Sequence, residues 1–205
     1  MDEQQSASTA QRPVAAPDST TESKKSKAEK GAGETLLRVT YHNHVAMSQL
    51  ADTKANMLIS INGVIISILI AVLTPRIGAF SWEFIPAAVL IAGCMISLAF
   101  AVIASRPRLN RRPITLEQVR RNEGNVLFFG QFMSMSLDEF QESMRLLLQD
   151  RAMAQDNLSR QLYFMGEALL AKYSRLHTAY VVFLASMGVA VALFVALLLT
   201  VGTPV

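Results

Sequence analysis

The stretch HVAMSQLADTKANMLISINGVIISILIAVL, residues 44–73, decides the fold of this chain. From Met57 to Leu73 it carries no ionisable side chain. With Ala55 and Asn56, this run reaches the roughly 17 to 20 residues that an α-helix needs to cross a hydrocarbon core. The stretch therefore predicts a helix that begins as an amphipathic segment in water and ends inside a membrane.

One face of this helix is polar or small along its length. At about 100° per residue, several such positions fall within an arc of about 80°. This polar face consists of Asp52, Asn56, Ser60, Gly63 and Ser67. Because lipid cannot satisfy an amide or hydroxyl side chain, we expect the face to turn toward other helices or a water-filled path.

The composition agrees with a membrane protein. The 205 residues are 51% hydrophobic and only 17% charged, which is the balance expected of a chain whose apolar surface meets lipid. The single cysteine, Cys94, lies within an apolar run, so no disulfide framework or cysteine metal site is expected. The net charge of +3 is modest, and we expect no nucleic-acid partner.

Two further runs have spanning length, Phe84 to Ala104 and Ala179 to Val201. Small residues recur at every fourth position in each: Gly93, Ser97 and Ala101 in the first, and Gly188, Ala192 and Ala196 in the second. Such spacing lets the backbones of neighbouring helices approach closely. The predicted fold class is therefore all-α, an integral membrane protein with three transmembrane helices and a small helical cytosolic region continuous with the spans.

The domain organisation that we predict has five parts. They are a disordered tail (1–34), a cytosolic amphipathic helix (35–56), a transmembrane hairpin (57–104), a cytosolic helical region (105–178), and a third transmembrane helix with a short C-terminus (179–205). The tail is rich in Ser, Thr, Ala, Gln and Lys and has almost nothing apolar to bury. A cleavable signal peptide would place an apolar segment close to Met1, whereas the first apolar run of the chain begins near residue 55. We therefore expect no cleaved signal peptide.

The region 105–178 is predicted to be helical throughout. Thr115 with Gln118, and Ser136 with Glu139, have the spacing of capping boxes at helix starts. Apolar residues recur at steps of three or four from Met153 to His177, and no helix breaker precedes the third span. We therefore expect one long helix to project from the membrane and to pack on the neighbouring helices or on the same helix of another subunit.

Positive charge sets the expected orientation. The charged residues of the loop between the first two spans are Arg76 and Glu83, whereas a cluster of arginines follows the second span. These are Arg106, Arg108, Arg111, Arg112, Arg120 and Arg121. Because cytoplasmic loops carry the excess of Lys and Arg, we expect a multi-pass protein of the cell inner membrane, with the N-terminus and residues 105–178 in the cytoplasm.

Ligand or pore candidates lie along the first helix. Asp52 is a carboxylate at the edge of hydrocarbon, which is costly unless it is paired or hydrated. Asn62 lies deeper and could bond an Asn or Ser of a neighbouring helix. The remaining candidates there are His44, Lys54 and Asn56. For Lys54 a headgroup contact is an equal alternative, and for His44 a local hydrogen bond on its own helix is simpler than a metal site.

Three candidates follow the second span. Arg111 and Arg112 could hold an anion such as a nucleotide phosphate, although a topogenic and headgroup role explains them more simply. Asn125 and the VLFFG that follows it indicate a packed turn. The chain shows no Walker loop, G-x-G-x-x-G, G-x-S-x-G, H-E-x-x-H or paired cysteines, so we predict no enzyme, catalytic residue, metal or cofactor.

Four segments resemble one known family. They are LADTKANMLISING at Leu50–Gly63, NVLFFG at Asn125–Gly130, SLDEF at Ser136–Phe140 and AKYSRL at Ala171–Leu176. Together they are similar to the transmembrane effectors of Pycsar, a bacterial pyrimidine cyclase system for antiphage defence. The resemblance covers about residues 40–200 and leaves out the tail.

The resemblance implies a function. A partner uridylate or cytidylate cyclase would make cyclic CMP or cyclic UMP during infection, and this protein would respond in the inner membrane. It would impair membrane integrity and so cause abortive infection, with residues 105–178 as the sensor region. We also expect a homo-oligomer in the lipid bilayer. A constitutive channel or transporter subunit, or a membrane scaffold, remains as an alternative.

Overall fold

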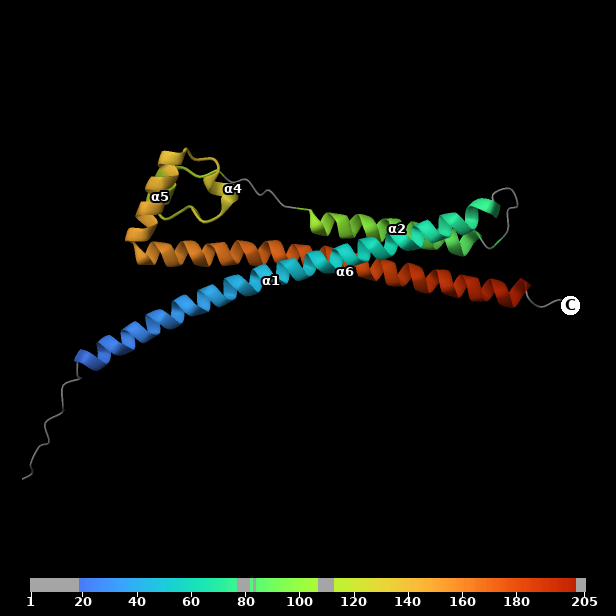
Figure 1. The fold of residues 1–205 in the computed structure, drawn as a ribbon, viewed down its shortest axis with the longest axis horizontal. Coiled ribbons are helices and arrows are strands. Elements are labelled where there is room, and N and C mark those ends of the chain that lie inside the picture. Colours follow the sequence, from blue (N-terminus) through green and yellow to red (C-terminus); the bar gives the residue numbers. More distant parts are fainter. Residues whose placement is uncertain (1–18, 77–81, 83, 107–112, 202–205) are drawn as a thin grey trace, which may run out of the picture. The chain divides into compact units, whose positions relative to one another are not determined.

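A computed structural model describes the backbone of residues 19–76, 82, 84–106 and 113–201, and the side chains from Gly31 to Thr200 within those ranges. These parts are mostly helical and contain no strand (Figure 1). The helices are α1 (Ser19–Leu73), η1 (Thr74–Arg76), α2 (Phe84–Ser105), α3 (Leu116–Arg120), α4 (Phe129–Phe132), α5 (Leu137–Gln149) and α6 (Arg151–Val201). The predicted all-α class is confirmed.

The chain divides into two compact units, Met1–Val39 and Thr40–Val205, and α1 runs through the boundary. In the first unit, residues 19–34 are helical, although we expected them in a disordered tail. Their Lys, Glu and Ala content favours helix once the rest of α1 has nucleated it. Residues 1–18 of that tail lie outside the described residues.

Three of the described helices are long and apolar enough to cross a membrane, as predicted. The most apolar windows of α1, α2 and α6 have mean hydropathies of 2.5, 2.6 and 2.8. Within these windows α2 buries 28% of its residues, whereas α1 and α6 each bury 11%. Most of the surface of α1 and α6 is therefore left for lipid or for another protein chain.

The small residues of α2 pack against α6. A Cβ added to Gly93 would collide with the Ser186 side chain, so the absence of a side chain at Gly93 permits the close approach. Ser97 and Ala101, which share its face, are fully buried. In α6, by contrast, a Cβ at Gly188 would meet nothing within 4 Å. The predicted small-residue contact is thus made by the face of α2, while the small face of α6 is uncovered within one chain.

The first helix contributes one buried stripe to the bundle. Ala51, Ala55, Leu58 and Asn62 are each at most 1% exposed and follow one another at steps of three or four, the spacing of one helix face. Leu58 packs with Cys94 of α2 and with Ala179 and Phe183 of α6. This cluster forms the core of the three spans.

The α3–α5 region, residues 113–150, has a core of its own. It consists of Ile114, Val119, Val126, Leu147 and Met153, the last from α6. Both predicted capping boxes are present: the Thr115 and Ser136 hydroxyls accept from the N–H groups of Gln118 and Glu139, whose side chains accept in return. The hydrogen bonds from Ser136 lower the pKa of Glu139 below its ordinary value of 4.5.

The long helix α6 is continuous from Arg151 to Val201, as the sequence predicts. Its first part packs against α5 and its later part lies along α2 (Figure 1). One rigid rod therefore carries both the contacts of the α3–α5 region and the third span.

Candidate functional site

A lysine on α6 joins the two long helices where α1 enters its apolar run. Lys172 Nζ lies 2.6 Å from Asp52 Oδ1 and 3.2 Å from the Ser48 hydroxyl, to which it donates. The side chain of Lys172 is 17% exposed and that of Asp52 is 43% exposed. The carboxylate is partly reached by water, although the paired Oδ1 itself is buried, so we expect the ion pair to contribute about 1 kcal/mol. We call Ser48, Asp52 and Lys172 the lysine clasp.

Two tyrosines of α6 extend this contact along α1. Tyr173 donates its hydroxyl to the Met47 carbonyl at 3.2 Å, and Tyr180 donates to the Lys54 carbonyl at 3.4 Å. The Lys54 side chain is exposed. Lys54 thus contributes its backbone to the contact between α1 and α6, and its ammonium is free to reach toward headgroups.

His44 lies at the same contact, one turn before the lysine clasp. Its Nδ1 lies 2.8 Å from the Thr40 carbonyl, so Nδ1 carries the proton and donates it. A Cβ at Gly166 of α6 would stand 3.5 Å from Nε2, an ordinary van der Waals distance. The local hydrogen bond predicted for His44 is present, but its partner is Thr40, whereas Ser48 and Asp52 both meet Lys172.

Asn62 links all three spans and is completely buried. Its Nδ2 donates to the Leu58 carbonyl at 2.9 Å and to Ser97 Oγ at 3.1 Å. Ser97 Oγ in turn donates to the Ala179 carbonyl at 2.9 Å. We call Asn62, Ser97 and the Ala179 carbonyl the span network. The bond that the sequence predicts from Asn62 to a serine of a neighbouring helix is thus present.

One atom of the span network is left unsatisfied. Asn62 Oδ1 is buried and accepts no hydrogen bond within the part of the chain that the structure describes. A buried acceptor without a partner costs on the order of 1–3 kcal/mol. A different packing of the spans that brought a donor to Asn62 Oδ1 would therefore remove this cost.

Beyond Asp52, which pairs with Lys172, the polar face of α1 is largely uncovered by the helices that the structure describes. Asn56 and Ser60 are exposed and line a shallow groove with Thr53, Met57 and Ile61. Ser67 donates to the Gly63 carbonyl of its own helix at 2.8 Å. Since the stripe that contains Asn62 occupies the side toward α2 and α6, the exposed residues Asn56, Ser60 and Ser67 are left to meet lipid, water or another chain.

Asn125 serves the packed turn that the sequence predicts. Its backbone N–H donates to Gln131 Oε1 at 2.8 Å, and its Nδ2 donates to Gln161 Oε1 at 2.9 Å. Its Oδ1 accepts from the Leu127 N–H at 3.0 Å. With these bonds Asn125, which is 1% exposed, fixes the turn to α6.

A second asparagine, Asn157 of α6, continues this network. Its Oδ1 accepts from the Val126 N–H at 3.0 Å, and its Nδ2 donates to the Met153 carbonyl at 3.1 Å. It also donates to Asn122 Oδ1 at 3.4 Å. Every polar atom of this fully buried side chain is satisfied.

Asn122 and Arg160 complete the attachment to α6. Asn122 ends α3 with a left-handed backbone, φ 57°, which asparagine tolerates better than most residues. Arg160 Nη1 donates to Asn122 Oδ1 at 3.3 Å and to the Gly124 carbonyl at 3.2 Å. We call this set the polar hub: Asn122, Asn125, Gln131, Asn157, Arg160 and Gln161.

Arg111 and Arg112 lie outside the described residues. Arg121 forms an exposed ion pair with Glu117 at 3.2 Å. Across residues 31–76, 82, 84–106 and 113–200, no group of three His, Cys, Asp or Glu residues is placed to hold a metal ion.

Sequence reasoning missed Lys172, Asn157 and Arg160. A signal existed for Lys172, because it stands three residues after Leu169 and four before Leu176, on the apolar face of α6. Asn157 likewise stands four residues after Met153, on the apolar face of α6. A polar residue inside an apolar helical pattern needs a partner, but the pattern does not say which.

The fold and these contacts define a polytopic helical membrane protein whose third span is continuous with a helix that carries a small folded region. The family model of the Pycsar effector protein domain, PycTM, matches residues 35–201, and the chain belongs to that family. No curated protein and no solved structure matches the chain. The chain is thus an effector of antiphage defence built into a membrane.

Proposed function

We propose that this effector responds to a cyclic pyrimidine nucleotide, cCMP or cUMP, made by a partner cyclase, and that it then impairs the inner membrane, so that the infected cell dies by abortive infection. The proposal rests on the family and on one observation above all. The helix α6 is unbroken between the polar hub and the spans, so a change at one end must move the other.

The orientation that we propose places the N-terminus and residues 105–178 in the cytoplasm, where a cyclase product would be found. The arginines after α2 support it, because cytoplasmic loops are enriched in Lys and Arg. Arg111 and Arg112 are our candidates for binding the nucleotide phosphate, since a guanidinium fork matches phosphate oxygens. Asn125 acts indirectly in this proposal, by fixing the turn of the sensor region to α6.

The lysine clasp is the element that we propose changes on signalling. It consists of a partly exposed ion pair and hydrogen bonds to Ser48, whose combined strength a bound ligand can match. If ligand binding to the sensor region moves α6 along α1, Lys172 leaves Asp52, and the contact between His44 and Gly166 also shifts. The carboxylate at the membrane edge then loses its partner.

The polar face of α1 is the surface that we propose acts on the membrane. Asn56 and Ser60 are exposed and, within the described chain, their side chains make no hydrogen bond. Polar side chains at this depth are satisfied by other helices or by water. A homo-oligomer that brings several polar faces together would satisfy them and, on signalling, form a path through the bilayer. Asp52 and Lys54 would lie at its mouth and Asn62 behind it. No catalysis is needed.

The test is dye entry in cells that express the protein and receive cCMP or cUMP in a membrane-permeant form. We expect dye entry only with the matching nucleotide. Asn56→Leu should abolish it, because leucine closes the polar face, whereas Asn43→Leu on the exposed, preceding part of α1 should not. Unchanged dye entry in Asn56→Leu and in Asp52→Ala would remove the polar face from the mechanism.

The uncovered polar face also fits a constitutive channel or transporter subunit. Such a protein would pass dye or ions at the same rate with and without nucleotide. A membrane scaffold would pass none under either condition. The same experiment therefore separates the three functions.

A further inference from the structure

A row of exposed side chains follows α1 with the spacing of a coiled coil. Its members alternate at steps of three and four residues, which are the a and d positions of a seven-residue repeat. The a positions are Asn43, Leu50, Met57 and Val64, and the d positions are Ala46, Thr53, Ser60 and Ser67. All eight side chains are exposed. We call this row the outer seam.

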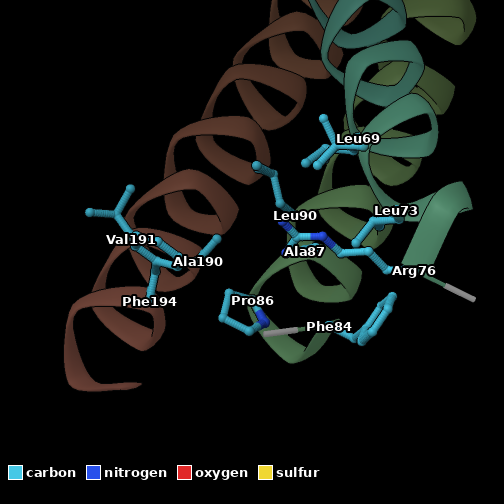
Figure 2. Close-up of a pocket in the computed structure, with 11 residues that line it drawn as sticks. Leu69, Leu73, Arg76, Phe84, Pro86, Ala87, Leu90, Ala190, Val191 and Phe194 are labelled. Carbon is cyan, nitrogen blue, oxygen red and sulfur yellow. The ribbon is translucent and has the colours of Figure 1, made fainter. Parts of the chain in front are cut away.

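The opposite side of α1 packs within the chain and keeps the same period. The buried stripe between Ala51 and Asn62 occupies the b and f positions of these repeats, which lie across the helix from a and d. Farther along, Leu69 is also at an f position and lines a pocket with Ala87 and Leu90 of α2 (Figure 2). The helices that the structure describes therefore cover one side of α1 and leave the outer seam open.

Lipid cannot cover the part of the outer seam that precedes the apolar run. Leu50 is 49% exposed, and the same spacing leads back in the sequence to Val39 and Leu36, which are 50% and 67% exposed. Because α1 is unbroken from Ser19 to Leu73, its first part projects from the bilayer and does not lie on the bilayer surface. Large apolar side chains that are aligned in water indicate a protein partner.

The charges of this projecting part favour a partner that is identical to it. From Thr35 to Thr53 the only Lys, Arg, Asp or Glu residues are Arg38 and Asp52, and both stand at c positions, outside the outer seam. A strongly acidic or basic partner would find no opposite charge along the outer seam. A second copy of α1, by contrast, would meet no like charge there.

The membrane determines how two copies of α1 can meet. Every copy enters the bilayer in the same direction and at the same depth, so two copies are parallel and equivalent residues face each other. Asn43 then faces Asn43 of the second copy, and a single Asn at an a position specifies the register of a parallel two-stranded coil. From Asn43 to Ser67 the outer seam runs for about 36 Å, and its three and a half heptads lie within the roughly three to four that indicate a coiled coil.

We propose that α1 pairs with α1 of a second copy along the outer seam, as a parallel two-stranded coiled coil. The d positions all carry small side chains, so the two helices can approach closely inside the membrane. Ser60 and Ser67 belong also to the polar face, and the pairing therefore brings two polar faces together. In that consequence the inference rests on the proposed function, but the pairing itself needs no nucleotide.

The test is disulfide cross-linking of single-cysteine variants of the full-length protein in vesicles, without nucleotide. The natural cysteine, Cys94, is buried and is replaced by alanine in every variant. Leu50→Cys should form a dimer on mild oxidation, because equivalent a positions of a coiled coil lie within disulfide reach. Tyr41→Cys, at an exposed f position that points away from the partner, should form none. No dimer at Leu50→Cys, or equal yields from the two variants, would overturn the proposal.

A charge on the outer seam provides the second arm of the test. With Ala46→Cys as the cross-linking site, Leu50→Lys should abolish the dimer, because two ammonium groups would then face each other. Tyr41→Lys is the matched control and should leave the dimer yield unchanged. Asn43→Leu should also retain the dimer, since leucine at an a position strengthens a coiled coil. If circular dichroism shows that Leu50→Lys has lost helix, the comparison of cysteine positions decides alone. A dimer that survives in folded Leu50→Lys would refute the pairing.

The outcomes also separate this inference from the proposed function. Cross-linking at the outer seam in a protein that passes no dye with either nucleotide would support the pairing and remove the proposed function. Nucleotide-dependent dye entry without a dimer at Leu50→Cys would leave the proposed function and refute the pairing.

Discussion

The polar hub and the span network are both built around buried asparagines, but they differ in how completely these side chains are hydrogen bonded. In the polar hub Asn157 is satisfied at both its oxygen and its nitrogen. In the span network Asn62 uses only its nitrogen, and its Oδ1 has no partner within the described chain. Both side chains are 0% exposed, so burial does not explain the difference.

The comparison indicates which region is fixed and which can change. A fully satisfied polar network specifies one arrangement and is costly to open. A partly satisfied one has a competing arrangement within a few kcal/mol. We infer that the α3–α5 region and α6 move as one body, and that the change occurs where α6 meets α1 and α2, at the lysine clasp and among the spans.

The largest effect should follow from breaking the polar hub. Asn157→Leu leaves the buried Val126 N–H without an acceptor, and we expect a loss of about 2–4 kcal/mol. Hydrogen exchange of the amides in residues 113–150, measured in detergent micelles, should accelerate accordingly. Gln155→Leu, at an exposed position of the same helix, should change it little. Equal exchange in the two variants would contradict the role of the polar hub.

A smaller effect should follow from overfilling the contact between α2 and α6. Gly93→Val would place a side chain against Ser186, and we expect about 1–3 kcal/mol of destabilisation. Gly188→Val faces open space and should be nearly neutral. Thermal unfolding of the two variants in the same detergent measures the difference. Similar melting temperatures would mean that the three spans pack differently.

Removing the span network should cost less still. Asn62→Leu loses the hydrogen bond to Ser97 but also removes the unsatisfied Oδ1. Hydrogen bonds between transmembrane helices contribute about 0.6 kcal/mol on average, so the thermal stability in detergent should change by less than in Gly93→Val. A loss as large as that of Asn157→Leu would abolish the contrast between the two asparagine sites.

The smallest effect should be the pH dependence of the cap of α5. Ser136 lowers the pKa of Glu139, so the carboxylate stabilises the helix at neutral pH, and this contribution is lost as the pH falls through the lowered pKa. Wild type should therefore exceed Glu139→Gln in stability at neutral pH and match it in acid. Thermal melts of both proteins across this range provide the measurement. A difference that grows toward low pH would contradict the assigned sign.

The sequence predicted the helices well and their partners poorly. Span length, capping spacing and the absence of a breaker before Ala179 depend on local chemistry, and the corresponding helices are present. The direction of the polar face could not be predicted in this way. Periodicity identifies the two flanks of α1 but does not tell which flank meets α2, and the structure assigns that side to Asn62.

The family resemblance seen in the sequence is confirmed by the match over residues 35–201.

The central claim is that a cyclic pyrimidine nucleotide opens a path along the polar face of α1. The most direct measurement is the release of a trapped dye from vesicles that contain only the purified full-length protein, before and after cCMP or cUMP is added. The account predicts release with one of these nucleotides, none without it, and none in Asn56→Leu. Release that is independent of nucleotide, or undiminished in Asn56→Leu, would contradict it.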